Sequence, residues 1–194
     1  AEIRTMDHFE EAFAKTMSEE GGYNFDRMDP GGETYMGISR VYWPGWDGWC
    51  IIDRYVEEGI VPEFAKRSLE SLVFHFYRAN FWNRMQGEKV AQISPEVACE
   101  LFDTAVNMDV SDAVRFLQTA LNMQRVATRA FSELVVDGLL GPNTLTALER
   151  YLATQPGAPG RNEKILLNCM NGEQYLCYKE NPRHPYFRGW FLRV

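Results

Sequence analysis

The sequence predicts a mainly α-helical protein with one small, irregular β-hairpin. Apolar residues recur at three- and four-residue intervals through most of the chain, the spacing of a helix with one buried face. The stretch that favours strands is rich in glycine and lies at residues 18–39. Strands and helices do not alternate, and the sequence has no heptad run or long-period repeat. This pattern argues against parallel α/β folds, coiled coils and solenoids.

The first predicted helix begins at Asp7, which can form a capping box with Glu10. An apolar stripe that includes Phe9 and Phe13 follows, and Gly21 and its neighbouring glycine end the helix. The chain then doubles back through the irregular hairpin.

Residues 62–82 form the next predicted helix, because their apolar side chains recur at helical spacing. Those side chains belong to Phe64, Leu69, Leu72, Val73, Phe76 and Tyr77. His75 lies within this apolar pattern, and we expect it to be a hydrogen-bonded core residue.

The second half of the chain is predicted to be helical as well. Ser94 and Pro95 are a strong helix start, with a capping side chain followed by proline at the first helical position. Three more helices are expected, over residues 112–124, after the turn at 136–141, and over residues 161–180 with a bend at Gly172. Asn143 or Thr144 is expected to cap the second of these three. Asp103 and Asn107, one turn apart, are expected to form a buried polar network.

Composition limits the class of protein. The chain has 194 residues, of which 45% are hydrophobic and 24% charged, so it can bury a substantial core as one domain or two. A net charge of -7 and the lack of any Lys or Arg run argue against a nucleic-acid or anionic-membrane binder. No apolar run has membrane-spanning length and no signal peptide is visible, so we expect synthesis in the cytoplasm and no integral membrane segment.

Metal and disulfide chemistry are not expected. The three histidines lie far apart without ligand-spaced partners, so we expect no metal and no cofactor. The four cysteines form no CxxC pair, and Cys169 and Cys177 are too far apart on one predicted helix to be bridged. We expect all four to be reduced and mostly buried.

Glu20 has the environment of a general acid. At 100° per residue, Glu20 projects within about 20° of Phe9 and Phe13, whereas Glu19 points about 100° away, towards solvent. A carboxyl group at the edge of an apolar face and near a helix C-terminus should hold its proton to higher pH than a free glutamate, so we expect its pKa to be raised. That is the requirement for an acid that works near neutral pH.

More acidic residues follow on the returning segment: Asp26, Asp29 and Glu33. The glycines of this stretch have no side chains to fill the space in front of the Glu20 carboxyl group, so a polymeric substrate could approach it. Two carboxylates across a cleft are the minimum needed to cleave a glycosidic bond. Asp29 also suits an Asx turn in Asp-Pro-Gly-Gly, and we expect Asp26 and Glu33 to be solvated or structural.

Aromatic residues supply candidate sugar contacts. Tyr23 and Tyr35 could line sugar subsites or belong to the core. Trp43, Trp46 and Trp49 lie in the Pro- and Gly-containing stretch "VYWPGWDGWC". They could form the wall of a groove or a small satellite core under a loop.

The motif "EGGYNFDRMDPGGETYMGIS" resembles the signature of glycoside hydrolase family 108, a family of phage and bacterial N-acetylmuramidases. The stretches "LFDTAVNM", "AVRFLQTALN" and "VDGLLGPNTLTAL" resemble the predicted peptidoglycan-binding region that accompanies this family. The ending "NPRHPYFRGWFLRV" resembles its terminal Gly-Trp signature. The resemblance implies a lysozyme-like fold, with a catalytic region at residues 1–90 and a helical peptidoglycan-binding region at 91–194 packed into the same globule.

The resemblance also implies an activity, cleavage of the β-1,4 linkage between N-acetylmuramic acid and N-acetylglucosamine, with Glu20 as the acid. The order Glu20, Asp29 and Thr34 is similar to the Glu–Asp–Thr arrangement of phage lysozymes, although the Asp-to-Thr gap is one residue shorter here. The resemblance implies peptidoglycan glycan strands as the substrate and an endolysin-like action on the wall after release or export. We expect a monomer.

Two alternatives stay open. A lytic transglycosylase would cleave the same bond with one glutamate and without water, which an irrelevant Asp29 would favour. A non-catalytic wall-binding or secretion-linked module would retain the fold, since members of the family have also been labelled secretion activators. The intact Glu20 weighs against this second alternative.

Overall fold

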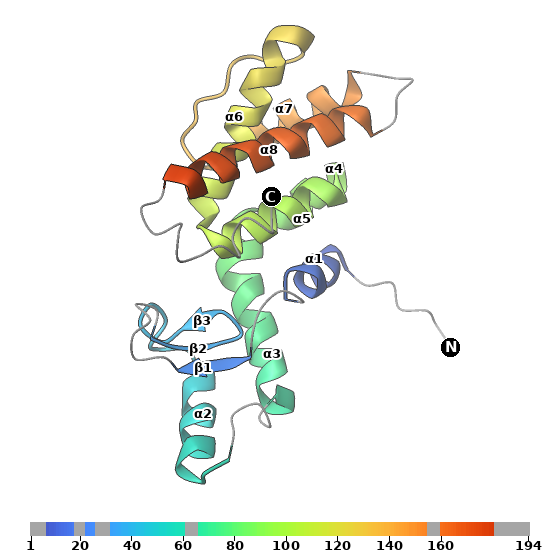
Figure 1. The fold of residues 1–194 in the computed structure, drawn as a ribbon. Helices are drawn as coiled ribbons and strands as arrows, with labels where there is room; N and C mark the ends of the chain where they lie inside the picture. The colour runs from blue at the N-terminus through green and yellow to red at the C-terminus, as the bar shows by residue number, and fades with distance from the viewer. Residues whose placement is uncertain (1–6, 18–21, 26–31, 61–65, 155–159, 181–194) are drawn as a thin grey trace, which may run out of the picture. The chain divides into compact units, whose positions relative to one another are not determined.

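The computed structural model describes residues 7–17, 22–25, 32–60, 66–154 and 160–180 (Figure 1). These residues form eight α-helices, a π-helical segment and one small antiparallel sheet, which confirms the predicted mainly α-helical fold. None of the described helices is long and apolar enough to cross a membrane. The chain divides into two compact units, residues 1–80 and 81–194.

The first unit contains helices α1 (His8–Met17), α2 (Gly48–Glu57) and α3 (Lys66–Tyr77). The predicted capping box of α1 is confirmed, because the Glu10 backbone N–H donates to Asp7 Oδ1 at 2.7 Å and the Asp7 N–H donates to Glu10 Oε2 at 3.1 Å. Helix α1 packs on α3 through aromatic rings, with Phe9 and Phe74 centroids 4.8 Å apart.

The predicted hairpin is a three-stranded sheet of β1 (Tyr23–Phe25), β2 (Glu33–Tyr35) and β3 (Ile38–Ser39), in that order. Met36 and Gly37 join β2 to β3 with positive φ angles of 48° and 79°, as a type I′ turn requires. The Tyr77 hydroxyl of α3 donates to the Met36 carbonyl at 2.6 Å. This hydrogen bond connects the β2–β3 turn to α3.

Helix α2 was not predicted, because the Pro- and Gly-containing stretch before it hides its start. Its N-cap residue, Asp47, makes no side-chain capping bond. Helix α2 is held by burial instead, since Trp49 and Ile52 are 2% and 0% exposed. Gly48 opens the helix, and a Cβ at that position would lie 2.3 Å from the Trp46 ring. The glycine therefore lets the Trp46 indole lie over the first turn.

The helix predicted over residues 62–82 is confirmed from Lys66, and it continues after α3 as the π-helical segment η2 (Arg78–Trp82). The prediction for His75 is wrong, because this side chain is exposed. The buried stripe of α3 includes Val73 and Phe76, and His75 precedes Phe76 by one residue. One residue is a rotation of about 100°, which turns His75 off the buried stripe.

The second unit contains α4 (Gly87–Ile93), α5 (Pro95–Asn107), α6 (Val110–Thr128), α7 (Pro142–Ala153) and α8 (Arg161–Glu180). The predicted start of α5 is confirmed, with the Val97 N–H donating to Ser94 Oγ at 3.1 Å. The short helix α4 was not predicted. The fully buried apolar residues of these helices include Val97, Leu101, Phe102, Leu117, Leu121, Leu148 and Leu166.

Two local predictions for the second unit need correction. Gly141, and neither Asn143 nor Thr144, is the N-cap of α7, with Pro142 at the first helical position. The expected pair of Asp103 and Asn107 is present, with the Asn107 amide donating to Asp103 Oδ2 at 3.2 Å, but both side chains are half-buried rather than buried.

The cysteines are free, as predicted, but they are not mostly buried. Cys50 is exposed, and Cys99, Cys169 and Cys177 are half-buried. On α8 the buried stripe includes Met170 and Tyr178, and each of these follows a cysteine by one residue. The helix therefore turns the two thiols about 100° off that stripe.

Candidate active site

The two carboxylates expected to carry out catalysis, Glu20 and Asp29, lie outside the described residues, as does Asp26. The other predicted site residues lie in the first unit, and they are Tyr23, Thr34, Tyr35, Trp43 and Trp46. The sheet, the turn after it and helices α1 and α3 therefore define the described part of the site.

The strand register places the predicted residues of β2 on opposite faces of the sheet. Thr34 pairs with Asn24 of β1 and Ser39 of β3. Because side chains alternate along a strand, Thr34 faces away from Glu33 and Tyr35. Thr34 is half-buried, whereas Tyr35 is 3% exposed.

Tyr23 is bonded to Glu33 across the sheet. Its hydroxyl donates to Glu33 Oε1 at 2.9 Å. Burial, followed by this hydrogen bond to a carboxylate, raises the pKa of Tyr23 to about 12. The Tyr23 hydroxyl thus stays protonated and holds Glu33 in place.

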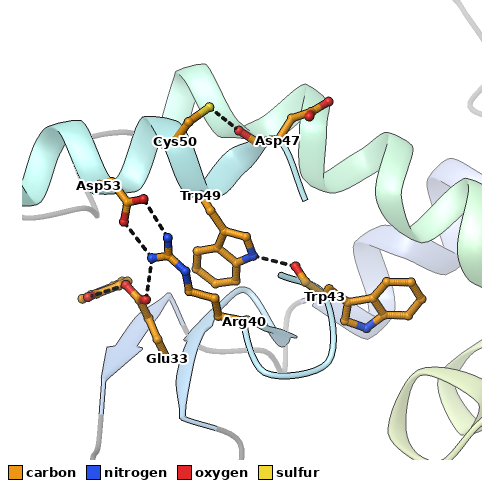
Figure 2. Close-up of polar contacts among 8 residues, drawn as sticks. Glu33, Arg40, Trp43, Asp47, Trp49, Cys50 and Asp53 are labelled. Carbon is orange, nitrogen blue, oxygen red and sulfur yellow. Dashed lines mark hydrogen bonds and ion pairs between the residues drawn. The ribbon is translucent and has the colours of Figure 1, made fainter. Parts of the chain in front are cut away.

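Arg40 joins the sheet to α2 (Figure 2). Its guanidinium donates to Glu33 Oε2 at 2.8 Å and forms a two-bond fork with Asp53, with both distances 2.7 Å. These hydrogen bonds raise the pKa of Arg40 and lower the pKa of Asp53. The guanidinium also lies over the Trp49 ring, 5.1 Å from its centroid.

This network makes Glu33 a structural residue, one of the two roles expected for it. Its side chain is 14% exposed and accepts hydrogen bonds from Tyr23 and Arg40. Arg40 and Asp53 were missed by sequence reasoning, because they are thirteen positions apart and belong to different elements. No period or motif connects them in the sequence.

The tryptophans around the start of α2 form both a small core and the wall of a pocket. Trp49 is buried, and its indole N–H donates to the Trp43 carbonyl at 2.8 Å. Trp43 and Trp46 are half-buried, and the Trp43 ring packs edge-on against Phe76 with centroids 4.9 Å apart. The Trp46 ring stacks on Tyr35 at 6.1 Å.

A pocket of about 450 Å³ lies against these rings. Trp43, Trp46 and Phe76 supply its aromatic surface, and Asp47 and Asn80 supply polar groups. Flat aromatic faces next to hydrogen-bonding groups suit a pyranose ring, which has an apolar face and a polar rim. Trp49 therefore belongs to a small core, whereas Trp43 and Trp46 line a pocket.

A second pocket, of about 670 Å³, lies where α1 ends. Its lining includes Met17 of α1, Tyr35 of β2, Met36 of the β2–β3 turn, and Arg67 and Glu70 of α3. Arg67 and Glu70 are exposed, and in the sequence they look like the solvated face of a helix. Their position beside α1 brings a cation and a carboxylate to an otherwise largely apolar pocket.

No group of three His, Cys, Asp or Glu side chains within the described ranges could hold a metal ion.

Comparisons with known proteins match each half of the chain to a family model. Residues 13–108 match the family model for glycosyl hydrolase 108, and residues 112–194 match the predicted peptidoglycan domain. The solved structure of Brucella abortus SagA is similar with a TM-score of 0.61 and 25% sequence identity, and the match covers 95% of this chain and 88% of that chain. A search of curated proteins found no match.

Proposed function

We propose that this protein is an N-acetylmuramidase. Residues 13–108 belong to the glycosyl hydrolase 108 family and residues 112–194 to the predicted peptidoglycan domain family. The protein is therefore a peptidoglycan-acting hydrolase. It cleaves the β-1,4 linkage between N-acetylmuramic acid and N-acetylglucosamine, with Glu20 as the general acid.

The pocket at the end of α1 carries this proposal. Met17 lines that pocket, and Glu20 follows Met17 by three residues. Three residues extend the chain by at most about 11 Å, so the pocket lies within reach of the Glu20 carboxyl group. The volume of about 670 Å³ suits one or two sugar rings.

The chemistry assigned to Glu20 follows from its neighbours in the sequence. The buried stripe of α1 includes Phe9, which is 0% exposed. From helical spacing in the sequence we expect Glu20 to continue this stripe near the negative end of the helix dipole. A carboxyl group at the end of a buried stripe and near a helix C-terminus resists ionisation, and this is the property that the proposed acid needs. The protonated acid donates its proton to the leaving glycosidic oxygen as the bond breaks.

Asp29 and Thr34 are assigned to the second half of the reaction. Asp29, assisted by Thr34, orients a water molecule or stabilises the oxocarbenium-like transition state. The separation of the Glu20 and Asp29 carboxyl groups decides whether the product inverts or retains configuration. Trp43 and Trp46 bind a sugar ring in the neighbouring aromatic pocket, and Tyr23 and Tyr35 hold the sheet beside them.

The test compares the wild-type chain with Glu20→Gln on purified peptidoglycan. Released fragments are reduced and identified by mass spectrometry. We expect reduced muramic acid ends from the wild type and about 10²–10⁴-fold slower release from the variant, because a general acid typically contributes that factor. Glu19→Gln is the matched control, because helical spacing in the sequence predicts that Glu19 lies off the apolar stripe. It should release fragments at the wild-type rate.

Other outcomes would change the assignment. Anhydro-muramic ends would make the protein a lytic transglycosylase. Equal release by wild type and Glu20→Gln would assign the acid to another residue. No release by the wild type over a range of pH and wall types would favour a non-catalytic wall-binding module.

A further inference from the structure

A well-anchored loop, here called the strap (residues 130–141), connects α6 to α7 and runs back alongside α6 (Figure 1). The Asn122 side chain of α6 donates to the Leu134 carbonyl at 2.8 Å and accepts from the Leu134 N–H at 2.9 Å. One turn earlier on α6, the buried Gln118 amide accepts from the Gly138 N–H at 3.0 Å and donates to the Leu139 carbonyl at 3.1 Å. The strap is therefore fixed at two points without secondary structure of its own.

A pocket of about 830 Å³ lies between the strap, α6 and α7. Its apolar surface comes from both the strap and α7, through Phe131, Leu134, Leu139, Pro142 and Ala147. Leu139 is 70% exposed, so apolar surface of the strap is available to a ligand.

The two sides of this pocket carry opposite charges. Glu133 and Asp137 belong to the strap, whereas Arg150 belongs to α7. Asp137 Oδ1 accepts from Gln118 Nε2 and from the Leu139 N–H, both at 2.9 Å, and these bonds lower the pKa of Asp137. Arg150 forms no ion pair within the part of the chain that the structure describes, and its side chain is exposed.

We propose that the strap pocket binds the peptide part of peptidoglycan, with Arg150 pairing with a peptide carboxylate and Asp137 receiving the peptide ammonium group. This inference rests on the proposed action on peptidoglycan and names the part of the polymer that the second unit recognises. Stem peptides carry free carboxylates, an amino group and small aliphatic side chains, and each has a counterpart in the pocket. A volume of about 830 Å³ is in the range that holds a short peptide.

The glycan fits this pocket less well than the peptide does. Sugar sites use broad aromatic faces, and the strap pocket is lined by no Trp or Tyr among the described residues. The N-acetyl and hydroxyl groups of a glycan chain also carry no charge to match Arg150 and Asp137. The aromatic pocket around Trp43 and Trp46 is the better place for a sugar ring.

The experiment titrates the intact chain with the synthetic stem peptide L-alanyl-γ-D-glutamyl-meso-diaminopimelate and, separately, with chitotetraose. Backbone amide NMR signals report the site, and the titration gives the dissociation constant. We expect the peptide, and not chitotetraose, to shift the signals of Asp137, Leu139 and Arg150. Arg150→Gln should weaken peptide binding about tenfold, which corresponds to about 1.4 kcal/mol, because the variant loses a charge-assisted hydrogen bond.

Arg161→Gln is the matched control, since Arg161 is an exposed arginine on α8 outside the pocket, and it should bind the peptide within about twofold of wild type. Unshifted pocket signals with the peptide, stronger shifts with chitotetraose, or unchanged binding by Arg150→Gln would each overturn the proposal. The peptide contains no glycosidic bond, so these outcomes are independent of Glu20. Failure of the muramidase proposal appears only in the release of sugar fragments.

Discussion

At the scale of single residues, Arg40 orients the described part of the site more than it stabilises the fold. Its side chain is 34% exposed, and that of Asp53 is 46% exposed, so solvent screens the attraction between them. The two-bond fork to Asp53 nevertheless fixes the direction of the guanidinium, which then holds Glu33. The sheet and α2 are thereby kept in one relative arrangement.

The titration of Tyr23 tests this network. Glu33→Gln should lower the pKa of Tyr23 from about 12, because the hydrogen bond to a carboxylate and the negative charge both favour the neutral phenol. The pKa should stay above 10, since burial is the largest cause of the shift and is unchanged. Phenolate absorbance, with the curve of Tyr23→Phe subtracted, measures this value. Glu149→Gln, an exposed glutamate on α7, should leave it unchanged.

Tyr23 also makes stability depend on pH at high pH. The folded state holds the phenolic proton more tightly than the unfolded chain does, so between pH 10 and about 12 unfolding releases a proton. The contribution of Tyr23 is therefore complete below pH 10 and is lost as the pH rises to about 12. Denaturant midpoints for wild type and Tyr23→Phe should converge across that range. A constant difference would contradict the raised pKa.

At the scale of elements, the strap depends on a glycine. Gly138 has a φ of 76°, and a Cβ there would lie 2.8 Å from the Ser111 carbonyl oxygen of α6. The strap can approach α6 this closely because Gly138 has no side chain. Gly141, three residues on, has a φ of -98° and open space around its Cα.

The two glycines give a matched pair of substitutions. Gly138→Ala should reduce the free energy of unfolding by about 2–4 kcal/mol, because it adds left-handed backbone strain to a clash with backbone. Gly141→Ala should cost about 0.5–1 kcal/mol, the effect of alanine at an N-cap. Chemical denaturation of the intact chain measures both. Equal effects would mean that the close approach of the strap to α6 does not matter for stability.

At the scale of the whole molecule, each unit offers a different kind of surface. The first unit has aromatic and largely apolar pockets beside the sequence expected to carry the catalytic acid, and the second has a pocket with opposed charges. The whole chain carries a net charge of -7, so its overall field repels a wall polymer rich in carboxylates and phosphates. Binding of the protein to the wall polymer then depends on local contacts rather than on attraction between net charges.

This charge predicts an unusual dependence on salt. Raising the ionic strength from 0.01 M to 0.15 M shortens the screening length from about 30 Å to about 8 Å, which weakens the repulsion. Fragment release from intact peptidoglycan should become faster over this range. Cleavage of a neutral, soluble chitooligosaccharide, where the protein cleaves it, should change little. Slower release at higher salt would point to a basic patch that net charge conceals.

The sequence alone determined the features that depend on neighbouring residues. Helical spacing located α1, α3 and the four long helices of the second unit, and the caps at Asp7 and Ser94 were predicted correctly. The motif around Glu20 and the stretches after Ser94 indicated the two families that the comparisons confirm. These are properties of short segments, in which each residue interacts with others a few positions away.

The tertiary structure decided which distant residues meet. Arg40 contacts Glu33 and Asp53, which belong to other elements. Arg67 and Glu70 of α3 line the pocket beside α1, and Arg150 of α7 lines the strap pocket. Each of these arrangements joins segments that are separate in the sequence. Helix α2 belongs to the same group, because burial of Trp49 rather than a capping signal holds it. A sequence pattern indicates the period of one segment. These contacts depend on how several segments pack against one another, and such packing produces no regular residue spacing in the sequence.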